Sequence, residues 1–259
     1  MFYRDMAEKN LEKARALISD KKYADACIEL REAVELDSTF AEAYNRWGWA
    51  LGKLESFNEA IQKFQKAISL EPAESHHYLD LASVYAKCGR QEDGIQACKK
   101  AVEIDPMNVI NYGALGKALG ESKRYTEALE IFKRAETINP SSVGILNDFG
   151  VTLYLLGHYD QALQKYRQSV EIDPTYVHGL YNCGQVLSKM ERHKEALEFF
   201  DRAVSIDPKY HDIYTQWAWS LIALNQNEEA LKKCEQAVQN DPYDDQGSQV
   251  PPNVTRTNY

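Results

Sequence analysis

The sequence has no run of 18 or more apolar residues, the length that a membrane-spanning helix needs. Lysine and arginine number 30 against 39 aspartates and glutamates, and the formal net charge is −9, so a basic stripe for nucleic acid is missing. The first ten residues, MFYRDMAEKN, lack the basic and then apolar blocks of a signal peptide. These absences exclude membrane insertion and argue against nucleic-acid binding and secretion.

Cysteine is scarce, and its spacing fits neither a disulfide framework nor a thiolate metal site. The five residues form no CxxC pair, and their number is odd. We expect reduced thiols that fill small apolar positions, which favours a reducing cytoplasm as the location of the protein. The cysteines are Cys27, Cys88, Cys98, Cys183 and Cys234.

The sequence also lacks the motifs that carry chemistry. There is no GxGxxG, GxxxxGK[ST], HExxH or GxSxG. The six histidines are scattered, and the adjacent pair His76 and His77 would point about 100° apart on a helix, a poor arrangement for metal ligands. We therefore predict no enzyme activity, no catalytic residues, no cofactor and no metal site.

What the chain does contain is an ordinary globular composition, 44% hydrophobic and 27% charged, arranged with a clear period. Residues 41–74 predict two short amphipathic helices followed by Pro72, which ends the second helix. Gly48 and Ala60 are small, as two closely packed helices require. Because such a pair cannot bury its apolar faces alone, neighbouring copies must stack on it.

The same pattern recurs every 34 residues without an insertion. The small residue of the second helix and the closing proline recur in register in most copies; Ser38 replaces the first proline and Ser169 one of the alanines. The seven copies are residues 7–40, 41–74, 75–108, 109–142, 143–176, 177–210 and 211–244. Residues 245–259 have no helical period, so we expect a flexible C-terminal tail after a solenoid that spans residues 1–244.

This period and residue set resemble the tetratricopeptide repeat (TPR) family over residues 7–244. The resemblance implies an all-α fold in which helix–turn–helix units stack into a right-handed superhelix. It also implies that the first helix of each unit lines a concave groove, and that the groove binds an extended peptide or a partner protein.

Mapping the solvent side of each first helix onto this sequence gives a set of candidate ligand-groove residues. They are Asn45, Arg46, Trp49, Lys53, Asp80, Lys87, Lys117, Asn147, Val151, Tyr154, Tyr181, Asn182, Gln185 and Trp219.

Two features of this set stand out. Trp47 and Trp217 take packing positions, so Trp49 and Trp219, two residues further on, should lie on the groove side, where tryptophan is a frequent binding hot spot. The alternative is that each packs against the neighbouring first helix. The second feature is an aromatic and aliphatic cluster flanked by amides, which suits a peptide backbone and its side chains. The alternative is an ordinary helix surface that binds no ligand. The cluster comprises Val151, Tyr154, Leu155 and Tyr181, and the amides are Asn147, Asn182 and Gln185.

Some TPR proteins hold an acidic C-terminus with a basic residue at the second position of a first helix. That row here contains no lysine or arginine, so this clamp is absent; it comprises Glu8, Glu42, His76, Ile110, Gly144, His178 and Asp212.

The sequence therefore predicts a non-catalytic scaffold that binds a peptide or protein of unknown identity in its groove. One alternative is a self-assembling structural protein that associates through its seventh repeat or tail. Another is the regulatory or targeting part of a larger enzyme.

Overall fold

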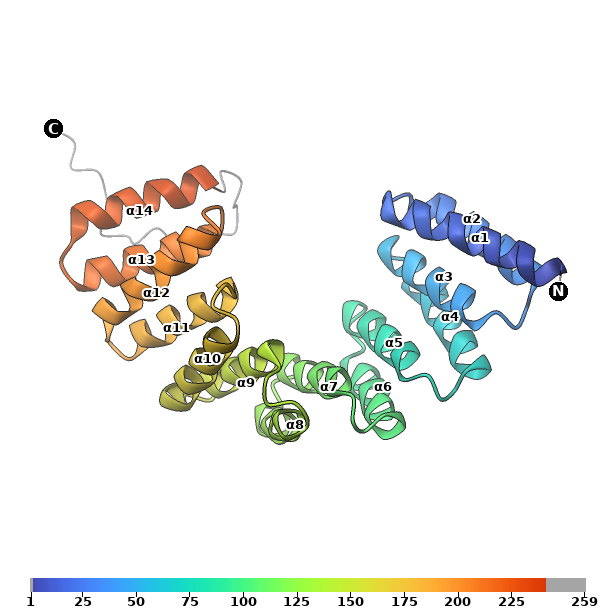
Figure 1. Cartoon of the computed structure of the whole chain (residues 1–259), viewed down its shortest axis with the longest axis horizontal. Coiled ribbons are helices and arrows are strands. Elements are labelled where there is room, and N and C mark those ends of the chain that lie inside the picture. The colour runs from blue at the N-terminus through green and yellow to red at the C-terminus, as the bar shows by residue number, and fades with distance from the viewer. Residues whose placement is uncertain (1, 241–259) are drawn as a thin grey trace. The chain divides into compact units, whose positions relative to one another are not determined.

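The computed structural model describes residues 2–240, which contain fourteen α-helices and no strand (Figure 1). Their bounds are α1 Phe2–Ser19, α2 Tyr23–Leu36, α3 Ala41–Lys53, α4 Phe57–Leu70, α5 Ser75–Lys87, α6 Gln91–Ile104, α7 Val109–Glu121, α8 Tyr125–Ile138, α9 Val143–Leu155, α10 Tyr159–Ile172, α11 Val177–Lys189, α12 His193–Ile206, α13 His211–Ala223 and α14 Asn227–Asn240. Each predicted repeat holds one helix pair, which confirms the all-α helix–turn–helix fold. The predicted tail, residues 245–259, lies outside the described residues.

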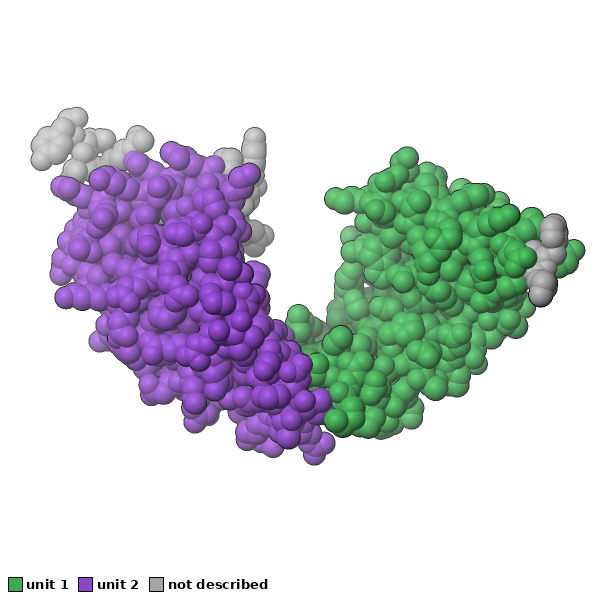
Figure 2. All heavy atoms as spheres, viewed as in Figure 1, with its two compact units in different colours: residues 1–127 green, residues 128–259 purple. Residues whose placement is uncertain are grey.

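The chain divides into two compact units, residues 1–127 and 128–259, which Figure 2 colours green and purple. In unit 1 each second helix packs on its own first helix and on the first helix of the next repeat, from α1 to α7. Unit 2 repeats this order from α9 to α14. Successive first helices also touch, namely α3, α5 and α7 in unit 1 and α9, α11 and α13 in unit 2.

The turn inside every repeat has the same backbone geometry. One residue per repeat adopts a left-handed conformation with φ between 59° and 79°, at positions 21, 55, 89, 123, 157, 191 and 225. In the first turn the Lys22 N–H donates to the Leu17 carbonyl at 2.8 Å, and the Lys21 N–H donates to that of Ile18 at 3.0 Å. These are the two bonds of a Schellman motif, which satisfies the last carbonyls of the first helix.

A side chain fixes most of the turns between repeats. Asp37 Oδ1 accepts the Thr39 N–H at 2.9 Å, and Asp173 Oδ1 accepts the Thr175 N–H at 2.9 Å. This short Asx turn ends the second helix and starts the next repeat.

Within a repeat, a glycine on the first helix lies against an aromatic ring on the second. A Cβ atom placed on Gly150 would be 2.5 Å from Tyr166, and one placed on Gly184 would be closer still to Phe200. Both rings are almost fully buried. The close approach predicted at Gly48, whose Cβ would be 3.0 Å from Phe64, is therefore also present at Gly150 and Gly184, where it requires glycine.

All five cysteines are free thiols, four of them buried and Cys88 half-buried. Burial raises the pKa of the Cys98 and Cys183 thiols to about 12, so both are inert, protonated core residues, as expected. No helix among the described residues has the length and apolar character that crossing a membrane requires.

Candidate functional site

The first helices of unit 2 form a cavity of about 410 Å³. Its side chains come from α9, α11 and α13 and from the start of α12. The 34-residue period places equivalent positions of successive first helices side by side, so residues far apart in sequence meet in one cavity. The lining residues are Tyr154, Gln185, Ser188, Lys189, His193, Gln216, Trp219, Ser220 and Ala223.

Aromatic side chains from two helices line this cavity. Trp219, on α13, is 38% exposed, which is high for a tryptophan. Tyr154, on α9, is half-buried, and its ring centroid lies 5.5 Å from that of Tyr159. Burial raises the pKa of the Tyr154 phenol, so it is a neutral hydrogen-bonding group. The cavity thus offers flat apolar surface with polar edges.

Uncharged hydrogen-bonding groups line the same cavity. The Gln216 amide forms no hydrogen bond with any residue in 2–240, and Gln185 Nε2 reaches only the Tyr181 hydroxyl at 3.4 Å. Ser188 and Ser220 bind one another at 2.7 Å and so hold α11 to α13. The Gln216 side chain is therefore available to a ligand, Gln185 is held by one long hydrogen bond, and the serines are occupied.

The predicted amides Asn147 and Asn182 are joined to each other. Asn182 Nδ2 donates to Asn147 Oδ1 at 2.8 Å, and Asn147 is only 8% exposed. This pair links α9 to α11, and Val151 lies half-buried one turn beyond Asn147. Asn147 is therefore a buried residue that joins two helices.

A second aromatic group lies on α11 and at the start of α13. The Tyr181 ring centroid is 5.6 Å from that of Tyr210, which in turn is 5.6 Å from the His178 ring. Burial raises the pKa of the Tyr181 phenol. Tyr210 occupies the N-cap position of α13, outside the helical pattern that defines the predicted groove residues.

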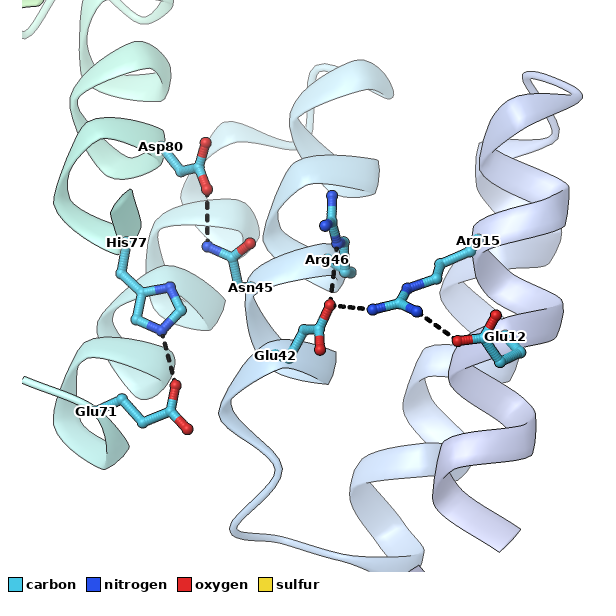
Figure 3. Close-up of polar contacts among 8 residues, drawn as sticks. All are labelled: Glu12, Arg15, Glu42, Asn45, Arg46, Glu71, His77 and Asp80. Atoms are coloured by element: carbon cyan, nitrogen blue, oxygen red, sulfur yellow. Dashed lines mark hydrogen bonds and ion pairs between the residues drawn. The ribbon is translucent and has the colours of Figure 1, made fainter. Parts of the chain in front are cut away.

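In unit 1 the first helices α1 and α3 carry charged side chains that form ion pairs with one another (Figure 3). Arg15 donates to both Glu12 and Glu42, and Arg46 lies 3.7 Å from Glu42, so one chain of ion pairs runs from α1 to α3. All four side chains are well exposed, and such pairs contribute little stability individually.

A second polar network joins α3 to α5. Asn45, which is 5% exposed, donates to Asp80 Oδ2 at 2.9 Å. His77 is 1% exposed, and its Nε2 lies 3.3 Å from Glu71 Oε2. Its Nδ1 is buried with no hydrogen-bond partner in residues 2–240. A cavity of about 460 Å³ adjoins these residues.

The other predicted residues of unit 1 divide into packed and exposed ones. Trp49 packs against the hydrophobic core, with Tyr23 at 5.8 Å between ring centroids and Lys53 Nζ 4.8 Å above its ring. Lys87 and Lys117 are exposed and form no ion pair within residues 2–240.

Three of the predicted groove residues, Tyr154, Gln185 and Trp219, lie together in the unit 2 cavity. Ser188, His193 and Ser220 line it too, although they are not among the predicted residues. One sequence feature could have pointed to His193. In four other repeats the same turn position holds an aromatic residue, such as Tyr159.

Comparisons with known proteins agree with this architecture. Tetratricopeptide repeat models match residues 111–142, 150–191 and 178–210. A model for the regulator of microtubule dynamics proteins 1-3 matches residues 50–111. The tetratricopeptide repeat-containing protein trd-1 of Caenorhabditis elegans is 29% identical over 75 residues, 29% of this chain and 10% of that protein. The aligned part is therefore a small share of that relative.

Solved structures show the same fold at low identity. A tetratricopeptide repeat protein of Parabacteroides merdae superposes with a TM-score of 0.72 at 15% identity, covering 93% of this chain and 95% of that one. YrrB, described as a TPR protein with an unusual peptide-binding site, has a TM-score of 0.55 at 22% identity, covering 70% and 93%. MamA has a TM-score of 0.57 at 21% identity, covering 65% and 92%. The chain therefore contains tetratricopeptide repeats and has the fold of tetratricopeptide repeat proteins.

Proposed function

We propose that this protein is a non-catalytic interaction scaffold that binds an extended peptide segment of a partner protein in the unit 2 cavity. The TPR fold supports the scaffold role, and the peptide-binding site named for YrrB is a precedent within the fold. The observation that carries the proposal is an exposed tryptophan, Trp219, beside the Gln216 amide, which has no hydrogen-bond partner in residues 2–240, and beside Gln185, which is held by one long bond.

The chemistry of the cavity suits a peptide. An extended chain presents unpaired backbone N–H and C=O groups, and the amides of Gln185 and Gln216 can donate to and accept from them. Trp219 and Tyr154 supply apolar area with few rotatable bonds, so little side-chain entropy is lost on binding. The cavity volume falls within the range of about 300–1,000 Å³ that is typical of ligand sites.

The test begins with selection of linear peptides from a random displayed library against the intact protein. We expect Trp219→Ala and Tyr154→Ala each to weaken binding of a selected peptide by about 1–3 kcal/mol, measured by titration calorimetry. Helical content by circular dichroism should change little, because neither side chain is in the core.

Trp49→Ala is the matched control, since Trp49 lies five repeats before Trp219 at the equivalent position and packs against the core. It should lower the unfolding temperature and leave peptide affinity unchanged. Equal affinity of the wild type and the Trp219 variant would contradict the proposal.

A further inference from the structure

The lining of the unit 2 cavity contains a positively charged side chain and no negatively charged one. Among its nine lining residues, Lys189 is the one with a permanent positive charge, and none carries a carboxylate. Lys189 is exposed at the end of α11 and forms neither an ion pair nor a contact over an aromatic ring within the described part of the chain. An unpaired cation in a cavity is a recognition element for an anionic group.

One of the two equivalent lysines in unit 1 is used differently. Lys53, four repeats before Lys189, lies 4.8 Å above the ring of Trp49 and is held by that contact. Arg15 and Arg46 in the same unit are paired with glutamates. At Arg15, Arg46 and Lys53 a ligand carboxylate would have to compete with these internal partners, whereas Lys189 has no such partner among residues 2–240. Lys87 of unit 1 is also exposed without an ion pair in residues 2–240, but it does not line this cavity.

The neutral groups of the cavity favour the same kind of ligand. The indole N–H of Trp219 has no hydrogen-bond partner in residues 2–240, and the amide N–H groups of Gln216 are equally unused. Together with Lys189 these are donors, whereas carboxylates and peptide carbonyls are acceptors.

We infer that the cavity selects an extended peptide in which an aspartate or glutamate pairs with Lys189 while a neighbouring apolar residue packs on Trp219. This inference rests on the proposed function and adds the charge class of the peptide to it. The net charge of −9 does not oppose it, because charges further away than the Debye length of about 8 Å are largely screened at physiological salt.

The test uses a printed array of random twelve-residue peptides, incubated with the intact wild-type protein and with Lys189→Glu. We expect bound peptides to be enriched in aspartate and glutamate for the wild type and not for the variant. A representative bound peptide is then compared with its own Glu→Gln version. The Glu→Gln change should reduce wild-type affinity about three- to tenfold and alter the affinity of Lys189→Gln by less than about twofold.

Lys232→Glu is the matched control. It makes the same change in net charge at an exposed lysine of α14, outside the cavity, and should leave the binding unchanged. Circular dichroism of each variant checks that it is folded.

Peptides that depend on Trp219 but show no acidic preference, or that bind Lys189→Glu equally well, would overturn this inference and leave the proposed function standing. Failure of every peptide to bind the wild type, or binding that is indifferent to Trp219, would contradict the proposed function as well.

Discussion

The two units place the same residue type at the same repeat position and give it different surroundings. In unit 1, Trp49 is closed off by Tyr23 from the preceding repeat and by Lys53 one turn further along its own helix. In unit 2, Trp219 is 38% exposed. A side chain that belongs to the packing in one unit is thus left at the surface in the other.

The neighbours explain the difference. The residue equivalent to Tyr23 in unit 2 is His193, and the one equivalent to Lys53 is Ala223. A smaller ring and a methyl group cover less of the indole, so a cavity remains beside Trp219. The repeat therefore fixes where a side chain lies, while the side chains of the preceding repeat and of the next helical turn decide whether it is available to a ligand.

The largest change in stability should come from the contact between a glycine on the first helix and a phenylalanine on the second. Both units have this contact, and it is tighter in unit 2. Gly48→Ala places a Cβ atom 3.0 Å from Phe64, whereas the Cβ atom of Gly184→Ala would overlap the Phe200 ring more severely. We expect Gly184→Ala to lower the free energy of unfolding by about 1–3 kcal/mol, measured by urea denaturation. Gly48→Ala should be nearly neutral, because the better helix propensity of alanine offsets a milder clash.

Gly144→Ala in α9 is the control for propensity alone, since its Cβ would meet nothing within 4 Å. It should leave stability unchanged or raise it by up to about 1 kcal/mol. If Gly184→Ala changed the free energy of unfolding no more than Gly144→Ala does, Gly184 and Phe200 would not be in close contact.

A second comparison concerns pH. Burial lowers the pKa of His77 in unit 1, despite the opposing effect of Glu71 and Asp80, and neighbouring His76 lowers it further. The equivalent positions in α11 and α13 hold Gly179 and Ile213, which do not titrate.

His77 binds a proton less readily in the folded protein than in the unfolded chain. The folded state therefore loses stability as the pH falls below the unfolded-state pKa of about 6.5. The loss should level off below the lower folded-state pKa. We expect the unfolding midpoint of the protein to be lower at pH 5 than at pH 7. His77→Asn, which introduces the residue type that Asn111 provides in the next repeat, should remove this drop; an unchanged pH profile in that variant would contradict the assignment.

The smallest expected change in stability concerns the turns at Asp37 and Asp173, which differ in one contact. Asp37 and Asp173 each accept the backbone N–H and hydroxyl of a threonine two residues later. Asp37 also accepts a hydrogen bond from Arg4 at 2.5 Å, which, with the bonds from Thr39, lowers its pKa to about 2.

A lowered carboxyl pKa stabilises the fold above the unfolded-state value of about 3.9, and this contribution disappears as the pH falls towards 2. At pH 7, Asp37→Asn should therefore cost about 1 kcal/mol, a value that allows for the exposure of Arg4, and Asp173→Asn should cost less. Thermal unfolding at pH 7 and pH 3 measures both; equal losses at pH 7 would show that Arg4 contributes nothing.

The fold was predictable because its determinants are local and repeated. The 34-residue period, the small residues at helix contacts and the closing prolines each recur, so one repeat informs the others. The contacts across first helices were not predictable in the same way. Asn45 and Asp80 belong to different repeats, and their bond depends on which two polar residues meet at one interface.

The same limit applies to Trp49 and Trp219. They are identical in the repeat pattern, which places both on the groove side while leaving open that each packs against a neighbour. Only the arrangement of the surrounding side chains separates the packed tryptophan from the exposed one.

We propose that Trp219 in unit 2 contacts the peptide, whereas Trp49 in unit 1 packs against the core. Fluorine NMR of the 5-fluorotryptophan-labelled protein tests it most directly, because the four tryptophans give four signals that single Trp→Phe variants assign. Addition of a peptide selected from the library should shift the Trp219 signal and leave the Trp49 signal in place. A shift at Trp49 with none at Trp219 would contradict this assignment.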